Sequence, residues 1–148
     1  MPRSVDRKLI FRLGGIGFLL DIARLVEICE QLADNFNPTY SDLEQGIVGA
    51  LQFRRTQVPV VDPALLLGVK SELRFSEKRA LILKGAEGNW ALLVDRVEEI
   101  SSADRFVSCE LPLLLKKSVS RGYTQVSLLA GEPMVHFEAD YFYGPRSI

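Results

Sequence analysis

The sequence has few of the residue types that catalytic, metal and redox sites need. Its 148 residues include one histidine, one tryptophan and two cysteines. Cys29 and Cys109 stand far apart and match neither a metal-ligand spacing nor a disulfide framework, so we read both as free thiols. The lone His136 is interpreted as a structural or surface side chain, and no glycine-rich loop opens a helix. We therefore expect no catalytic residue, no metal site and no cofactor.

The chain also lacks strong net charge and long apolar runs. The net charge is −1, which argues against sequence-independent nucleic-acid binding, because such binding needs clustered cations. No segment approaches the ~20 apolar residues that span a bilayer, and the polar, charged first eight residues do not resemble a signal peptide. We expect a cytoplasmic protein with no nucleic-acid partner and no direct membrane insertion.

One stretch of the sequence occurs twice. Residues 9–28 and 81–100 align without a gap at a distance of 72 residues. Each contains an apolar run, a glycine-bearing turn, a second apolar run and a charged segment ending in Glu-Ile, a pattern that predicts a β-hairpin. Six aligned pairs are identical: Leu9/Leu81, Ile10/Ile82, Leu20/Leu92, Arg24/Arg96, Glu27/Glu99 and Ile28/Ile100. Any two hairpins look alike to some degree, but the matched charges beyond the hairpin favour a true repeat.

A second hairpin follows in each half of the sequence. Residues 46–53 and 58–61 form the first of these, and residues 123–129 and 133–137 form the other. Short strands at this spacing, with little sign of long helices, indicate an all-β architecture of small barrels. Two halves of about 70 residues would each be marginal alone, so an exchange of strands between them would give one cooperative core.

The clearest local signal is a short helix after residue 61. Asp62 is placed to cap its N-terminus, Pro63 occupies the first helical position and Gly68 follows the last turn. This capping role is a sufficient function for Asp62.

The carboxylates raise the hypothesis of an enzyme that uses acid–base chemistry. Glu27, Asp62, Asp95 and Glu99 are its candidates, and it requires Glu27, Asp62 and Asp95 to converge in one cleft. The equivalent places of Glu27 and Glu99 in the repeat favour a structural or interface role instead.

A second alternative is a small β-barrel that binds single-stranded nucleic acid. Its stacking platforms would be Phe36, Tyr40, Phe53 and Trp90, but the acidic balance weighs against it. The aliphatic surplus over few strands is more consistent with a face that meets another protein. From the residues alone, we interpret the chain as a non-enzymatic β interaction module.

Several segments in order resemble the CheW-like domain, the coupling module of bacterial chemotaxis. They are the glutamate of VEI at Glu27, the GALQFR segment at 49–54, VPVVD at 58–62, LVDRV at 93–97 and GEPMVHF at 131–137. The resemblance covers nearly the whole chain. It implies one domain over residues 8–143, with flexible ends at 1–7 and 144–148. It also implies two intertwined five-stranded β-barrel-like subdomains, one SH3-like and one OB-like.

The resemblance also implies a function. Family members are adaptors that couple chemoreceptors to a CheA-type histidine kinase. One face binds the regulatory domain of the kinase, and a groove between the subdomains binds the cytoplasmic tip of the receptor. By position, Glu27 and Arg54 match a glutamate and an arginine of the family, and we expect them to form an ion pair or a shared surface near the partner contacts. The predicted partner-binding residues are Glu27, Arg54, Arg55, Asp62 and Asp95.

Two positions depart from the family pattern. Arg55 stands where the family usually has glycine, so we expect the turn after Arg54 to be reshaped. Pro63 replaces the usual leucine after the aspartate, a change that the first position of a helix accommodates.

Overall fold

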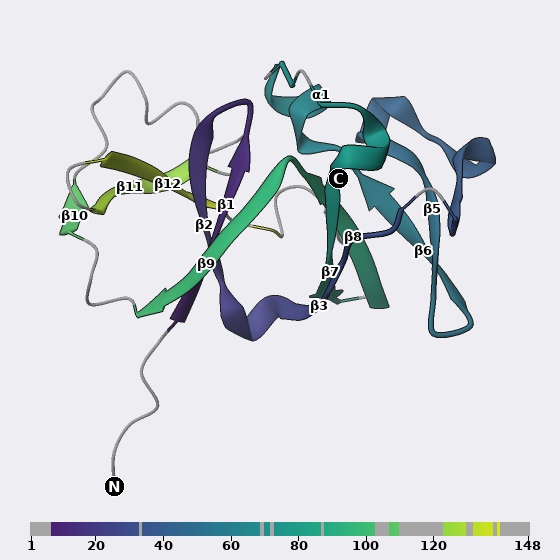
Figure 1. Ribbon diagram of the computed structural model, residues 1–148, viewed down its shortest axis with the longest axis horizontal. Helices are drawn as coiled ribbons and strands as arrows, with labels where there is room; N and C mark the ends of the chain where they lie inside the picture. Colours follow the sequence, from purple (N-terminus) through teal and green to yellow (C-terminus); the bar gives the residue numbers. More distant parts are fainter. Residues whose placement is uncertain are drawn as a thin grey trace, which may run out of the picture.

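The computed structural model describes residues 7–32, 34–68, 70–71, 73–86, 88–102, 107–109, 123–129, 132–137 and 139. The predictions for residues 1–6 and 144–148 lie outside these ranges. The described residues form two sheets, sheet A and sheet B, which lie side by side in Figure 1.

Sheet A combines the start of the chain with its last strands. Its order is β10-β11-β12-β2-β1-β9. The strands are β1 (Arg7–Leu13), β2 (Ile16–Asp21), β9 (Arg96–Ser102), β10 (Val107–Cys109), β11 (Tyr123–Leu129) and β12 (Glu132–Phe137).

Sheet B contains the central part of the chain, in the order β3-β7-β8-β6-β5-β4. The strands are β3 (Leu25–Cys29), β4 (Phe36–Asn37), β5 (Ile47–Phe53), β6 (Thr56–Val61), β7 (Arg79–Gly85) and β8 (Gly88–Val94). The predicted all-β fold with two subdomains is therefore confirmed. Each sheet has six strands, because the short β4 and β10 extend the five expected.

The helices among the described residues are short. They are α1 (Pro63–Leu67) and the 3-10 helices η1 (Ile22–Arg24), η2 (Pro38–Tyr40), η3 (Leu43–Gln45) and η4 (Phe75–Glu77). Asp62 caps α1, since its Oδ1 accepts the Ala64 N–H at 3.0 Å. Gly68 ends the helix with φ 71, and its N–H donates to the Ala64 carbonyl. The predicted helix and both of its ends are confirmed.

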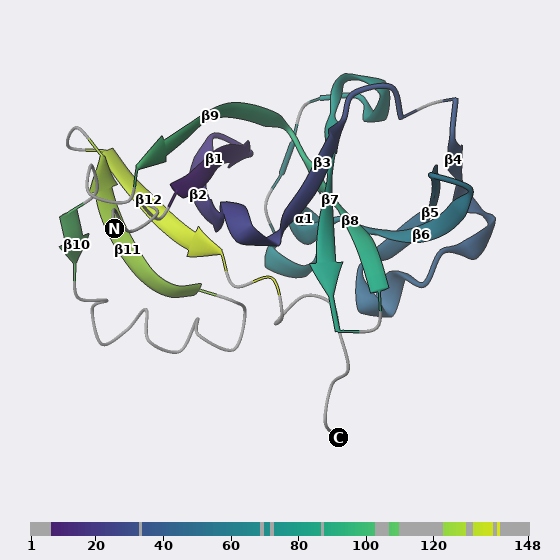
Figure 2. The same cartoon turned by 90° about the horizontal axis from the view of Figure 1, so that it is seen from below.

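The two halves of the chain exchange one strand each. β3 follows the β1–β2 hairpin along the chain but pairs with β7, and β9 follows the β7–β8 hairpin but pairs with β1. Figure 2 shows β3 beside β7 and β9 passing β1. The registers repeat as well, because Leu9 faces Ile100 and Ile28 faces Leu81. The predicted repeat and the predicted exchange of strands are both present.

The second hairpin of each half repeats in the same way. β6 lies parallel to β8 with Val60 opposite Ala91, and β12 lies parallel to β2 with His136 opposite Leu19. The β5–β6 and β11–β12 ladders also correspond, since Ile47 faces Val61 in one and Tyr123 faces Phe137 in the other. The separation here is 76 residues, so the connection before this hairpin is four residues longer in the second half.

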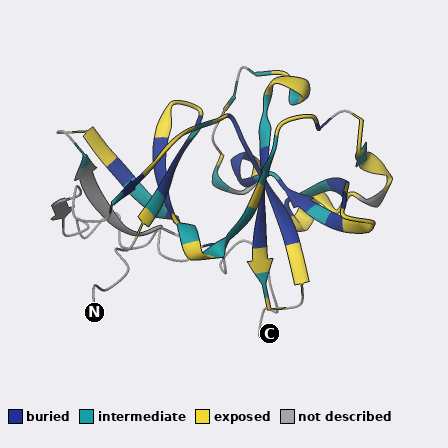
Figure 3. Ribbon diagram, turned by 60° about the horizontal axis from the view of Figure 1, so that its bottom comes forward, coloured by how far each residue is buried: buried dark blue, intermediate teal, exposed yellow. Residues whose placement is uncertain are grey.

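Both faces of the central strands are buried. Leu9 and Phe11 face the core between the sheets, whereas Ile10 faces a separate cluster with Leu19 and Met134. Repeat mates meet in the core between the sheets: Leu9 and Leu81, Phe11 and Leu83, Phe18 and Trp90, Leu20 and Leu92. This double burial explains why the hairpins read as continuous apolar runs rather than as strict alternation. Figure 3 shows buried segments on strands of both sheets.

The shared core predicts that the sheets unfold together. Ile10 is 2% exposed and lies in the separate cluster of sheet A with Leu19 and Met134. Trp90 lies on β8, so its fluorescence follows the unfolding of sheet B. We expect Ile10→Ala to lower the free energy of unfolding by about 2–5 kcal/mol. Urea titrations followed by Trp90 fluorescence and by far-UV circular dichroism should shift together.

The matched control is Ile16→Ala on β2 of the same sheet, where the side chain is 41% exposed. We expect this control to stay within about 0.5 kcal/mol of wild type. A fluorescence transition that Ile10→Ala leaves at the wild-type midpoint would show that the sheets unfold separately.

Candidate functional site

The five predicted binding residues fall at three places. Glu27 lies on β3, and Arg54 and Arg55 form the turn between β5 and β6. Asp62 caps α1, and Asp95 lies between β8 and β9. The structure brings Glu27 and Arg54 together. It gives Asp62 a local hydrogen bond and gives Asp95 hydrogen bonds to distant segments of the chain.

The predicted ion pair between Glu27 and Arg54 is present. Arg54 Nη2 lies 3.3 Å from Glu27 Oε1, with the two side chains 67% and 47% exposed. The Arg54 guanidinium also lies over the Phe53 ring, 4.7 Å from its centroid. Exposed ion pairs stabilise by about 0–1 kcal/mol, so the main effect is geometric. The pair joins β3, at one edge of sheet B, to the turn between β5 and β6.

The β5–β6 turn has an unusual backbone. Arg54 has φ 47 and Arg55 has φ 66, and they are the non-glycine residues with positive φ among those described. Phe53 pairs with Thr56 across the turn, so the hairpin keeps a two-residue loop of the kind that favours Asn-Gly. Arg55 thus takes a left-handed conformation suited to glycine. The turn after Arg54 thus keeps its length, and the backbone strain is confined to the two loop residues.

Asp95 is a junction between chain segments. It is 8% exposed, and its carboxylate accepts the Gly14 N–H at 2.8 Å and the Ser71 hydroxyl at 2.7 Å. Its own N–H donates to the Arg12 carbonyl at 2.9 Å. Asp95 therefore holds the β1–β2 turn and the segment after α1 against the link between the sheets.

A groove lies beside Asp95 where the two sheets meet. A hollow of about 730 Å³ is lined by side chains of β3, β7 and β9, including Ile28, Arg79 and Val97. A neighbouring hollow of about 470 Å³ shares Asp95 and two other lining residues with it. The lining mixes apolar side chains such as Ile28 and Val97 with charged ones such as Arg79, a composition that suits a protein segment better than a small charged substrate.

The acid–base hypothesis is not supported by this arrangement. Burial raises the pKa of Asp62, an effect that the charge of Lys78 and the bond from Ala64 partly offset. Asp95 adds a smaller upward effect on the pKa of Asp62, so these two carboxylates are near each other. Glu27, however, is engaged with Arg54 at the hairpin.

The stacking platforms proposed for nucleic acid are wrong at two positions. Trp90 is 0% exposed and Phe53 is 6% exposed, so both rings are core residues. Phe36 packs against Phe75, with ring centroids 4.4 Å apart. The sequence could not show this, because an aromatic residue on a strand has the same pattern whether its face is covered or open.

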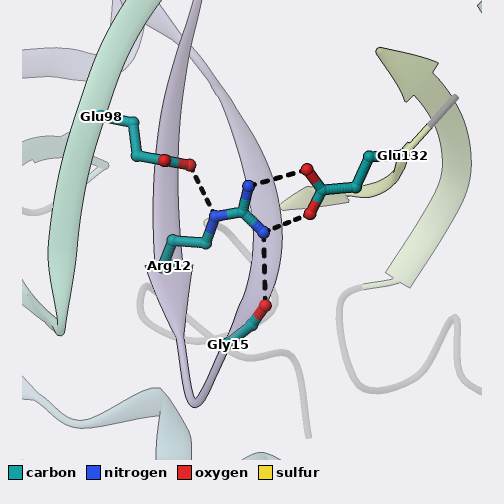
Figure 4. A network of polar contacts seen from close by, with 4 residues as sticks. All are labelled: Arg12, Gly15, Glu98 and Glu132. Carbon is teal, nitrogen blue, oxygen red and sulfur yellow. Dashed lines mark hydrogen bonds and ion pairs between the residues drawn. The ribbon is translucent and has the colours of Figure 1, made fainter. Parts of the chain in front are cut away.

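The sequence did not predict the ion-pair cluster around Arg12, in which the guanidinium contacts three carboxylate oxygens. Figure 4 shows Arg12 of β1 between Glu98 of β9 and Glu132 of β12. Arg12 Nε donates to Glu98 Oε1 at 2.5 Å, and Nη1 and Nη2 donate to the two Glu132 oxygens at 2.5 and 3.0 Å. Nη1 also donates to the Gly15 carbonyl at 3.3 Å. The partners lie 86 and 120 residues from Arg12 in sequence, so no local motif reports the cluster.

The cluster shifts the pKa values of Arg12 and Glu132. Hydrogen bonding to Arg12 holds the pKa of Glu132 below its usual value, and the bond to Glu132 raises the pKa of Arg12. In the repeat, Lys84 matches Arg12 but Val26 matches Glu98. The repeat therefore places no glutamate at the position in sheet B that matches Glu98, and among the described residues the cluster is found in sheet A.

The lone histidine and the free thiol of Cys29 are both partly buried. Burial, and then the charge of Lys8, lower the pKa of His136. Burial, followed by the charge of Glu27, raises the pKa of Cys29. No group of His, Cys, Asp and Glu side chains in the described ranges is arranged to hold a metal ion. Likewise, none of the helices described here has the length and apolarity to cross a membrane.

These features define a class of protein: a small β module of two interlocked sheets, with a groove at their junction and a charged hairpin tip. A sequence model of the CheW-like domain family matches residues 7–132. The chain therefore belongs to the CheW-like domain family, whose members are scaffolds and adaptors of chemotaxis signalling.

A solved structure agrees with this assignment. The crystal structure of the scaffolding protein TtCheW from Thermoanaerobacter tengcongensis is similar with a TM-score of 0.72 and 16% sequence identity, over 91% of this chain and 90% of that chain. At this identity the likeness shows the fold. A comparison with curated proteins finds no match.

The left-handed backbone of Arg55 predicts a stabilising substitution. The left-handed conformation costs a non-glycine residue roughly 1–2 kcal/mol of conformational energy. We therefore expect Arg55→Gly to raise the free energy of unfolding by about 1 kcal/mol in a urea titration. Arg55→Ala retains the Cβ and is the matched control, for which we expect no comparable gain. Equal stabilities of the two variants would show that the turn is not strained.

The Arg12 cluster predicts a pH dependence. The pKa of Glu132 is lower in the folded state than in the unfolded state, so the folded state binds fewer protons at acidic pH. Its contribution to stability is present above the ordinary glutamate value of about 4.3 and is lost as the pH falls through the lower folded-state value. We expect Arg12→Gln to flatten this part of the dependence in urea titrations between about pH 7 and pH 3.

The control for this experiment is Arg7→Gln, which removes an exposed charge from the same strand. It should keep the wild-type slope. An identical slope in Arg12→Gln and wild type would contradict the role of the cluster.

Proposed function

We propose that this protein is a non-enzymatic cytoplasmic adaptor that couples chemoreceptors to a CheA-type histidine kinase. The observation that carries the proposal is the match of residues 7–132 to the CheW-like domain family. The fold likeness to a scaffolding protein supports it. An adaptor needs two separate surfaces on one rigid body, and the groove and the charged hairpin are two such surfaces.

The groove beside Asp95 is the proposed dock for the receptor tip. A helical hairpin that enters a groove presents apolar anchors to its floor and polar groups to its rim. Here Ile28 and Val97 supply apolar contacts, and Arg79 and Arg96 lie among the charged lining residues. Asp95 contributes by holding the chain segments that form the groove, so its part in binding is to maintain shape.

The face around Glu27 and Arg54 is the proposed contact for the regulatory domain of the kinase. The Arg54 guanidinium is exposed, and its position is fixed by Glu27 and by the Phe53 ring. A cation held in place in this way loses less side-chain entropy on binding than a free one. In this proposal Asp62 contributes to partner binding indirectly, because it caps and so stabilises helix α1.

A charge reversal tests the kinase contact. We expect Arg54→Glu to weaken binding to the isolated regulatory domain about tenfold, or about 1.4 kcal/mol, because it places two carboxylates beside each other. Isothermal titration calorimetry measures the affinity, and circular dichroism checks that the fold is intact.

Arg7→Glu reverses an exposed charge on sheet A and serves as the control. It should bind like wild type. The proposed function itself fails if folded wild-type protein binds neither the kinase domain nor a receptor-tip fragment at about 100 μM, where even complexes of micromolar affinity form.

A further inference from the structure

The β5–β6 turn presents two guanidinium groups in succession. Arg54 is paired with Glu27 at 3.3 Å. Arg55 is exposed and makes no ion pair with any residue that the structure describes. The positive charge of Arg55 is therefore available to pair with a group outside the described residues.

The backbone of the turn is a poor choice for arginine if the loop only reverses the chain. Both residues have positive φ, and glycine or asparagine would form the same two-residue loop without the strain. Strained non-glycine residues persist where the surroundings enforce them, and they concentrate at binding and catalytic sites. Arg55 is exposed, so packing does not explain its presence.

A hollow beside the turn offers a place for an acidic side chain. It has a volume of about 270 Å³ and is lined in part by Phe53, Arg54, Thr56 and Asn89. A guanidinium, a hydroxyl and a side-chain amide can all donate to a carboxylate, and a bond from a charged donor is the strongest of these. The hollow and the second guanidinium thus favour the same kind of ligand.

We propose that the Arg54–Arg55 turn binds an acidic segment of the kinase regulatory domain, with Arg55 supplying a contact that the family's glycine lacks. This inference rests on the proposed function. One partner carboxylate enters the hollow beside Arg54, and a second binds the Arg55 guanidinium at the tip. The strain at Arg55 is the cost of presenting that second cation.

The test separates charge from backbone strain. Affinity for the isolated kinase regulatory domain is measured by calorimetry for wild type, Arg55→Gly, Arg55→Gln and Arg55→Lys, at low and high salt. Arg55→Gly removes the charge and the strain, Arg55→Gln removes the charge alone and Arg55→Lys retains both. Arg7→Gln on sheet A is the matched control for loss of an exposed positive charge.

We expect Arg55→Gly and Arg55→Gln to bind about tenfold more weakly than wild type and to show less dependence on salt. Arg55→Lys should lose less, and Arg7→Gln should not change. If wild type binds and both uncharged variants stay within about twofold of it, the inference fails and the turn is a solvated loop. If wild type itself does not bind the kinase domain, the kinase contact of the proposed function fails and the inference fails with it.

Discussion

The pairing of β3 with β7 and of β9 with β1 is the constraint on which the rest of the structure depends. Each sheet obtains an edge strand from the other half of the chain, in matching register. Repeat mates such as Phe18 and Trp90 then meet in one core between the sheets. Each half would be marginal alone, because a unit of about 70 residues has a small interior.

The same exchange positions the surfaces that we propose to bind partners. β3 and β9 are outer strands of their sheets, so Glu27 is accessible and Val97 lines the groove. The link between β8 and β9 is held by Asp95, which keeps the groove in shape. The proposed binding residues thus lie on edges and turns, while packed strands hold them in place, a common division in proteins that recognise others.

Much of this arrangement could be predicted because local sequence patterns determine it. The hairpins, the capped helix at Asp62 and the repeat are all read from spacing, turn residues and matched positions. The ion pair of Glu27 with Arg54 followed from the family resemblance rather than from spacing. The Arg12 cluster could not be found, because its partners are 86 and 120 residues away. The burial of Trp90 was also hidden, since coverage of a sheet face depends on a second sheet and not on the strand itself.

The exchanged strand also sets the order in which the protein can assemble during synthesis. Leu9 on β1 pairs with Ile100 on β9, so β1 emerges about 90 residues before its partner strand, a delay of roughly 5–20 s at the usual rates of translation. Sheet B lies between them in sequence and can form in that interval. Until β9 is synthesised, the apolar faces of β1 and β2 are exposed on the nascent chain, where chaperones or neighbouring chains can bind them.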